Sequence, residues 1–238
     1  MQSKQLLSLI ALANFMGALT LPHLALAQPA PLISLVFPPT DDSRDGPARS
    51  EGGGHRGPAC ISPNVTPLLS LVPHQTQQAQ TIDPTPTLYW YIPPTPAQQA
   101  EFILVNGEGD LTYQTTIRLP QQSGIMRLKL PQEAALEIDK TYQWTFSLLC
   151  DQEEPSRNTY VSGNIRRTTL SSAIQTQLQT ADPFRQAQVL AKSKIWYDTL
   201  DRVAQVRSQR QEEWVELLTS VGLSAIATEP FQDCCMAQ

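Results

Sequence analysis

The side chains that most often carry acid–base chemistry are sparse in this chain. It has three histidines, and two of them, His55 and His74, lie in a glycine-rich run and before a glutamine-rich stretch. Neither position is expected to hold an imidazole rigidly, as general base catalysis requires. The sequence also contains no nucleophile elbow, no His-Glu-x-x-His run and no dinucleotide fingerprint. We therefore predict no catalytic residue and no cofactor.

Carboxylates give a stronger argument for chemistry, because several of them flank segments with a β pattern. These are Glu101, Glu108, Asp110, Asp151, Glu153 and Glu154. Two carboxylates at a suitable separation can cleave a glycosidic bond, and the last three could bind Ca²⁺ through oxygen ligands. The run from Asp151 to Glu154 lacks the alternating ligands and the mid-loop glycine of a calcium loop. We predict a solvated acidic face and no metal site, and keep glycan cleavage as an alternative.

Four aromatic side chains are candidates for an interaction surface. In an extended strand Tyr89 and Tyr91 point away from Trp90, so an open face would present them to a sugar ring or a protein. Trp196 and Tyr197 widen the apolar side of a predicted helix and have the same two interpretations. Burial beneath the helical end is the favoured interpretation, and exposure on a contact surface is the alternative.

The first 27 residues have the pattern of a secretory signal peptide. Lys4 gives a positive start, an apolar stretch follows, and Ala25-Leu26-Ala27 is a small-residue cleavage site. The apolar stretch is short for a bilayer core of about 30 Å, so an uncleaved anchor is the weaker alternative. No later segment is long and apolar enough to cross a membrane. We expect a periplasmic or secreted protein that begins at Gln28.

In an exported protein the four cysteines are candidates for disulfides, because disulfides form in oxidising compartments. We predict a bridge between Cys60 and Cys150, each of which lies beside an ordered segment. Such a bridge closes about 90 residues and is worth about 4–5 kcal/mol in the chain-entropy model. Cys234 and Cys235 lie in the last five residues and could pair with another chain or stay reduced. A zinc site is the weaker interpretation, because no histidine or second cysteine pair lies near them.

Composition narrows the classes of partner. The 238 residues include 17 basic and 22 acidic side chains, a formal net charge of −5. A nucleic-acid-binding protein needs a basic stripe, so we predict no nucleic-acid partner. Residues 28–59 combine prolines with Gly52-Gly53-Gly54, which predicts a flexible linker. Its apolar patch Leu32–Phe37 could dock as a stray strand, and its glycines lack the Gly-Lys-Ser/Thr ending of a phosphate loop.

Residues 60–168 have the alternation of an antiparallel β-sandwich. In the segment that begins at Tyr142, apolar rings alternate with Gln, Thr and Ser, which indicates a half-buried strand. Leu136 precedes Tyr142 by six residues, which resembles the tyrosine corner of immunoglobulin or fibronectin type III-like sandwiches. Strands are expected at Pro67–Val72, Thr87–Ile92, Glu101–Asn106, Leu111–Leu119, Ile125–Leu130, Tyr142–Cys150 and Tyr160–Arg167.

From residue 169 to 228 the period changes to that of helices, before a tail at 229–238. A short helix is expected at Ser171–Gln179, and a long one begins at the N-cap Asp182 and ends near Gln209. A third helix at Glu212–Val221 ends before Gly222. The predicted fold class is therefore α+β, a sandwich followed by a C-terminal helical hairpin.

Several short stretches together resemble a family of exported cyanobacterial proteins known as a domain of unknown function. They include Arg56-Gly57-x-x-Cys60, the run Pro86–Pro93 and the run Ile195–Asp198. The resemblance extends over about residues 56 to 226 and implies export and a shared fold, without catalytic residues. We predict an exported non-enzymatic module for protein interaction or envelope support. The alternative is a periplasmic protein that binds or cleaves a glycan.

Overall fold

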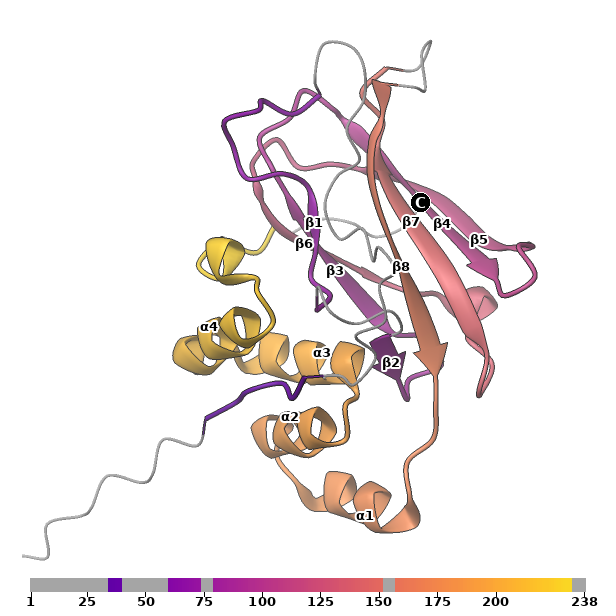
Figure 1. The fold of residues 1–238 in the computed structure, drawn as a ribbon, viewed down its shortest axis with the longest axis vertical. Coiled ribbons are helices and arrows are strands. Elements are labelled where there is room, and N and C mark those ends of the chain that lie inside the picture. The colour runs from indigo at the N-terminus through magenta and orange to yellow at the C-terminus, as the bar shows by residue number, and fades with distance from the viewer. Residues whose placement is uncertain (1–33, 40–59, 74–78, 152–156, 233–238) are drawn as a thin grey trace, which may run out of the picture. The chain divides into compact units, whose positions relative to one another are not determined.

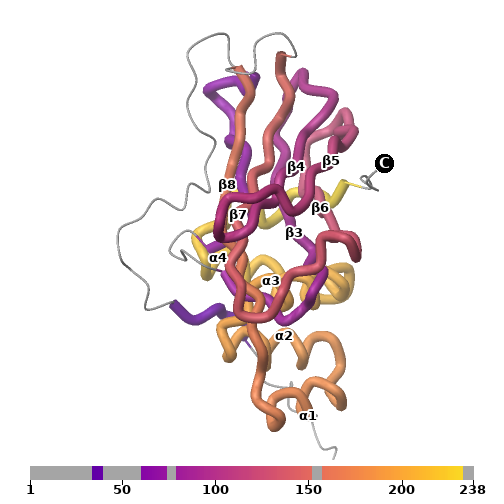
Figure 2. Tube along the Cα trace, turned by 90° about the vertical axis from the view of Figure 1, so that its right-hand side faces the viewer, coloured from indigo at the N-terminus to yellow at the C-terminus, as the bar shows by residue number. Residues whose placement is uncertain are grey.

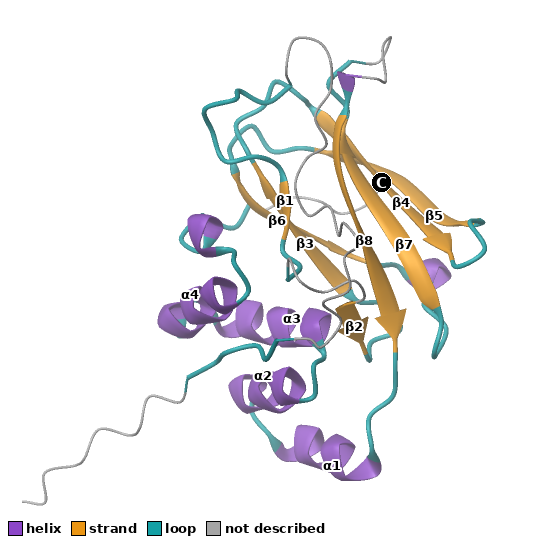
Figure 3. Cartoon of the chain, viewed as in Figure 1, coloured by secondary structure: helices purple, strands orange, loops and turns teal. Residues whose placement is uncertain are grey.

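A computed structural model describes residues 34–39, 60–73, 79–151 and 157–232 of the chain (Figure 1). The predicted signal peptide, most of the predicted linker, His55, His74 and the Cys234-Cys235 pair lie outside the described residues. Strands and helices both occur, so the fold class is α+β (Figure 3). Most strand and helix bounds match the predicted segments closely. The segment predicted at Pro67–Val72 is a strand only over Leu69–Ser70, and two further differences are given below.

The strands form two sheets. The first has the order β1-β3-β6 and is antiparallel, with β1 (Leu69–Ser70), β3 (Thr87–Ile92) and β6 (Gly124–Lys129). The second has the order β2-β8-β7-β4-β5. Its strands are β2 (Ala79–Thr81), β8 (Thr159–Arg167), β7 (Thr141–Leu148), β4 (Gln99–Asn106) and β5 (Leu111–Arg118).

Strand β2 was not predicted, and it corrects the expectation of wholly antiparallel sheets. It pairs in parallel with β8, from Ala79 opposite Ile165 to Thr81 opposite Arg167. Its three residues are too few to show an alternation, so the sequence carries no signal for it. The strand exists because β8 pairs with β7 along one edge and offers its other edge to β2, where it satisfies the backbone groups of β2.

The two sheets contact each other through aromatic rings. The indole of Trp90 on β3 stacks on Phe146 of β7 with ring centroids 4.4 Å apart, and meets Trp144 edge to face at 5.8 Å. Gly163 of β8 lies opposite Trp144, and a Cβ there would come within 2.5 Å of the indole ring. A side chain at that position would therefore displace Trp144. The predicted alternation of β7 is confirmed, since Tyr142, Trp144, Phe146 and Leu148 are the buried residues of this strand.

The corner before β7 also follows the prediction. The backbone N–H of Glu137 donates to the Tyr142 hydroxyl oxygen at 3.1 Å. Leu136 is buried beside it, as is the ring of Tyr142. A buried phenol that accepts from a loop N–H braces the connection into the strand, which is the role of a tyrosine corner.

In the part of the chain that the structure describes, four α-helices replace the predicted hairpin. They are α1 (Ser172–Thr180), α2 (Pro183–Lys192), α3 (Trp196–Val206) and α4 (Gln211–Ser220). Short 3-10 turns occur at Gln132–Ala134 and Ser224–Ile226. The helices gather at one end of the two sheets (Figures 1 and 2).

The predicted long helix is wrong because the chain breaks between α2 and α3. Lys194 has a φ of 60°, in the left-handed region. Its N–H donates to the Ala191 carbonyl, and the N–H of Ile195 donates to the Leu190 carbonyl. These two bonds are the Schellman arrangement that ends a helix, usually with glycine at the left-handed position. Because lysine and not glycine occupies this position, the break has no sequence signature. By contrast, the predicted end of α4 at Gly222, with a φ of 86°, is confirmed.

The first residues of α3 attach the helices to both sheets. Trp196 donates its indole N–H to the carbonyl of Leu71, just after β1, at 2.7 Å. The next residue, Tyr197, accepts the indole N–H of Trp144 from β7 at 2.9 Å. Both rings are buried. The described residues belong to one compact unit, and sheets and helices share a hydrophobic core.

The described ends of the chain also pack on this core. Within the predicted linker, Ser34–Pro39 lies against the helices as extended chain, and Leu35 and Phe37 are buried. At the other end Phe231 forms a parallel bridge with Ile125 of β6. The predicted disulfide is confirmed, because the structure joins Cys60 and Cys150, whose Cα atoms are 5.6 Å apart.

We predict that Tyr197→Phe destabilises the whole molecule. The change removes the acceptor of the buried Trp144 indole N–H, and an unsatisfied buried donor costs about 1–3 kcal/mol. Chemical denaturation followed by circular dichroism measures the free energy of unfolding. Tyr160→Phe on β8 is the matched control, since its ring is 39% exposed, and it should change stability by less than about 0.5 kcal/mol. Equal effects of the two substitutions would contradict the prediction.

Candidate functional site

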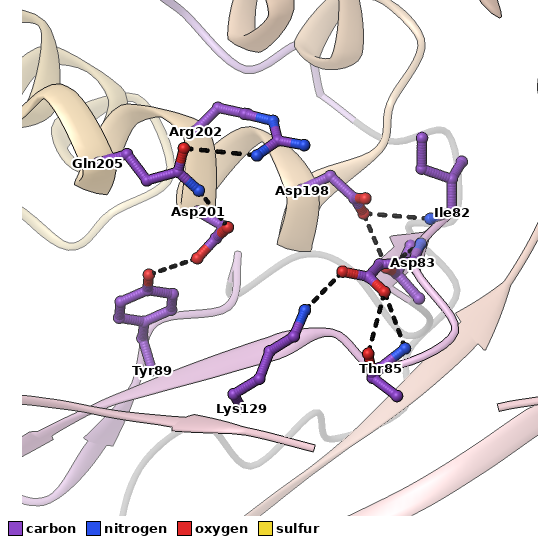
Figure 4. Close-up of polar contacts among 10 residues, drawn as sticks. Ile82, Asp83, Thr85, Tyr89, Lys129, Asp198, Asp201, Arg202 and Gln205 are labelled. Carbon is purple, nitrogen blue, oxygen red and sulfur yellow. Dashed lines mark hydrogen bonds and ion pairs between the residues drawn. The ribbon is translucent and has the colours of Figure 1, made fainter. Parts of the chain in front are cut away.

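Three aspartates approach one another where α3 meets the connection between β2 and β3 (Figure 4). Asp198 and Asp201 lie on α3, and Asp83 lies between the two strands. Asp198 and Asp201 are about one helical turn apart on α3, and Asp83 lies in the loop beside that turn. All three carboxylates line one small cavity, and each has its own hydrogen-bond partners.

Asp198 holds the end of β2. Its Oδ2 accepts a hydrogen bond from the Thr81 hydroxyl at 2.7 Å and another from the Ile82 N–H at 3.1 Å. Burial raises the pKa of Asp198 from 3.8 to about 6, although the two hydrogen bonds act in the opposite direction. The charge of Asp83 adds a smaller upward effect, and Arg202 a smaller downward one. The carboxyl group therefore changes charge in weakly acidic solution.

Asp201 is bound to the central strand of the smaller sheet. The hydroxyl of Tyr89 donates to its Oδ1 at 2.8 Å, and the amide of Gln205 donates to its Oδ2 at 2.8 Å. The pKa of the Tyr89 phenol is raised well above its ordinary value, first by burial and then by the charge of Asp201. The phenol is consequently a permanent donor in this contact and not an acid or base at physiological pH.

Asp83 lies at the outer side of the cluster. It pairs with Lys129 of β6 at 2.6 Å, and its Oδ1 accepts from the N–H of Thr85 at 2.9 Å. The Lys129 and Asp83 side chains are 52% and 37% exposed. Ion pairs with this exposure contribute little stability, so the main role of Asp83 is to shape the loop.

The space between these groups is small. A cavity of about 20 Å³ is lined by Asp83, Pro86, Thr87, Tyr197, Asp198, Asp201 and Arg202. That volume holds about one water molecule, whereas ligand pockets usually measure about 300–1,000 Å³. Among the described residues no group of three or more His, Cys, Asp or Glu could hold a metal ion. The cluster therefore connects α3 to the strands through hydrogen bonds and does not have the size of a substrate site.

The four aromatic residues considered as candidates for a contact surface are buried. The exposed fractions are 2% for Tyr89, 4% for Tyr91, 0% for Trp196 and 2% for Tyr197. Helix α3 contacts the outer face of β3, and Phe231 lies edge to face with Tyr89 at 6.1 Å. The structure thus shows the favoured interpretation, burial, and the alternative of an open contact surface is wrong for these rings. They lie beneath the helical end and the C-terminal segment.

The predicted carboxylates do not come together as a catalytic pair. Glu101 accepts from the Gln114 side chain on the outer face of β4 and β5, and Asp151 pairs with Arg157 at 2.9 Å. Glu108 and Asp110 lie in the exposed turn beyond the other end of β4. From Glu101 to the end of β4 at Asn106 the strand rises by about 17 Å, so Glu108 and Asp110 lie farther from Glu101 than the separation that glycosidases use. Glu153 and Glu154 lie outside the described residues.

Sequence analysis missed Asp198 and Asp201, although a signal was present. Both lie within a mostly apolar run that begins at Ile195. A helix whose residues only pack in the core would not need carboxylates there. A carboxylate beside buried residues usually has a hydrogen-bond partner. The partner could not be found from the sequence, because Thr81 is more than a hundred residues away and lies on the strand that was not predicted.

Comparison with known proteins adds a family. A family model described as Domain of Unknown Function (DUF928) matches residues 51–231. The chain belongs to this family. The match confirms the resemblance to a domain of unknown function, while the cyanobacterial origin stays a prediction. The DUF928 match includes all the described strands and helices.

Comparisons with curated proteins and with solved structures do not identify an activity. No curated protein matches the chain. A solved structure that it is similar to is the solution structure of the fn3 domain of human collagen alpha-1(XX) chain, at 16% identity and a TM-score of 0.28. That likeness covers 50% of this chain and 93% of the other. Within the described part of the DUF928 chain, no helix has the length and hydrophobicity of a membrane span.

We predict that Asp198 makes stability depend on pH. Its folded pKa is raised, so the folded state keeps a proton that the unfolded chain has released between about pH 4 and pH 6. Stability should therefore fall as the pH rises through this range. Asp198→Asn keeps the acceptor for Thr81 and Ile82 but cannot ionise. Wild type should lose on the order of 2 kcal/mol relative to this variant between pH 4 and pH 7.

Denaturant unfolding of both proteins at several pH values provides the measurement. Parallel stability curves for wild type and Asp198→Asn would contradict the assigned role, as would a wild-type curve that rises relative to the variant.

Proposed function

We propose that this DUF928 chain is an exported, non-enzymatic module that binds other proteins or supports the cell envelope. The observation that supports this most directly is that the polar groups at the candidate site are bound to other parts of the same chain. Asp198, Asp201 and Tyr89 each hold a neighbouring element of the same chain and leave a space of about 20 Å³. Residues used in this way stabilise a scaffold, and a scaffold acts through its surface.

We further propose that the two sheets form an immunoglobulin or fibronectin type III-like sandwich. The ring contacts of Trp90 with Phe146 and Trp144 across the sheets support this, and so does the hydrogen bond of Tyr142 at the corner. A sandwich of this kind exposes its outer sheet faces and loops. On the five-stranded sheet that face carries Tyr160, which is 39% exposed.

The proposed location is periplasmic or extracellular, after cleavage behind Ala27. The leader pattern of residues 1–27 supports it, and the Cys60–Cys150 bridge fits an oxidising compartment. We expect the exported product to have an intact mass that begins at Gln28. A product that retains Met1 and stays in the cytoplasm would overturn this part of the proposal. Peptide mapping without reductant on the same sample should recover Cys60 joined to Cys150.

A pull-down tests the function itself. Mature chain should retain specific proteins from an envelope extract, and the same chain unfolded by reduction should not. In parallel, the mature chain is offered cell-wall glycans, for which the expected result is neither retention nor release of sugars. Glycan release that is lost on Glu101→Gln or Asp151→Asn would overturn the proposal and establish the alternative, a glycan-cleaving protein. Glycan retention without release would establish a carbohydrate-binding one.

A further inference from the structure

The segment Ser34–Phe37 runs beside the helices (Figure 1, indigo). It contacts Trp196 of α3 and Glu216 and Ser220 of α4, and we call the surface that these three residues form the groove. The segment is neither helix nor strand. The side chains of Leu35 and Phe37 are 2% and 4% exposed, while Val36 between them is 54% exposed. Two buried anchors, two residues apart, with an outward residue between them, are the pattern of an extended peptide held on one side.

Side chains of α4 bind the backbone of this segment. Glu216 accepts from the Leu35 N–H at 2.7 Å and from the Ser34 hydroxyl, and Ser220 Oγ accepts from the Phe37 N–H at 3.1 Å. Glu216 and Ser220 are four residues apart, so they lie on the same side of the helix. Backbone N–H groups of the segment are thereby satisfied without a neighbouring strand.

The floor of the groove contains a buried ring, Trp196, that has its own hydrogen-bond partner. Phe37 meets Trp196 edge to face, with centroids 5.0 Å apart. Trp196 is fixed in turn by its bond to the Leu71 carbonyl. The groove is therefore formed by residues that have structural partners of their own. A preformed site of this kind loses little conformational entropy when a peptide binds.

We propose that this groove recognises an extended segment with an aliphatic residue and an aromatic residue two positions apart, and that Ser34–Phe37 of a second copy occupies it. This inference deepens the proposed interaction role and rests on it. All the contacts described above join residues 34–37 to α3 and α4, so they are the same whichever copy supplies the segment. Residues 40–59 separate the segment from Cys60 and can span up to about 70 Å.

The protein concentration decides whether the groove is occupied by the segment of its own chain or by that of a second copy. A segment tethered to its own groove has an effective concentration of about millimolar. Exchange between copies is therefore expected where copies are crowded together, or where a copy cannot use its own segment. The second condition can be created by substitution, which makes the proposal testable in dilute solution.

The test is a complementation between two full-length variants. The segment variant carries Leu35→Ala and Phe37→Ala and keeps its groove. The groove variant carries Glu216→Lys and Ser220→Ala and keeps its segment. Each should be a monomer alone, and their equimolar mixture should contain a heterodimer by native mass spectrometry and sedimentation at about a tenth of the millimolar effective concentration. As the matched control, a chain with all four substitutions should form no dimer with the segment variant.

A mixture that remains monomeric would overturn the exchange, provided that both variants keep the near-ultraviolet circular dichroism of wild type. A second measurement applies if the groove variant does not fold. A synthetic peptide of residues 34–39 is added to the segment variant and should raise its melting temperature. The same peptide with alanine at positions 35 and 37 should bind at least about tenfold more weakly.

Absence of any shift with the unaltered peptide would overturn the recognition site itself. The proposed function is scored separately, because the pull-down uses wild-type chain and counts proteins other than this one. Failure of the complementation thus leaves the interaction role standing, and failure of the pull-down leaves the exchange to be judged by these mixtures.

Discussion

The first turn of α3 is the contact on which the rest of the structure depends. Three consecutive residues there bind three separate parts of the chain. Trp196 donates to the carbonyl after β1, Tyr197 accepts from Trp144 on β7, and Asp198 accepts from the end of β2. One turn later, Asp201 accepts from Tyr89 on β3. Two layers of strands have an open end, and this turn closes it with apolar rings whose polar atoms are all hydrogen-bonded.

That arrangement explains why the aromatic residues do not form a binding surface. A helix of eleven residues is marginal by itself in water and must bury its apolar side against other elements. The face of β3 opposite Trp90 supplies that area, and the two tyrosines that it carries become part of the core. Among the described residues, the surfaces that we propose for partners are the outer face of the five-stranded sheet and the groove on α3 and α4. The proposed role of the chain therefore lies in those surfaces and not in the four buried aromatic residues.

Local sequence patterns predicted those features whose causes are local. Alternation located β7, the spacing of Leu136 and Tyr142 located the corner, and Asp182 and Gly222 located helix ends. Each of these depends on residues within a few positions of one another.

Features with distant causes were missed. Strand β2 exists because β8 passes beside it, and the site aspartates depend on partners more than a hundred residues away. The break at Lys194 is local, but it places a lysine where glycine is the usual residue. The distinction is physical, since a short strand or a buried carboxylate is stabilised by tertiary contacts that no window of sequence contains.

Native-state hydrogen exchange is the most direct measurement of this account, because it gives the free energy of opening for each element separately. If the start of α3 holds both sheets, amides in α3 and in the central strands β3 and β7 should open together, with the free energy of global unfolding. Exchange in α3 at a much lower free energy, while β3 and β7 stay protected, would show that the helices are an appendage and would contradict the account.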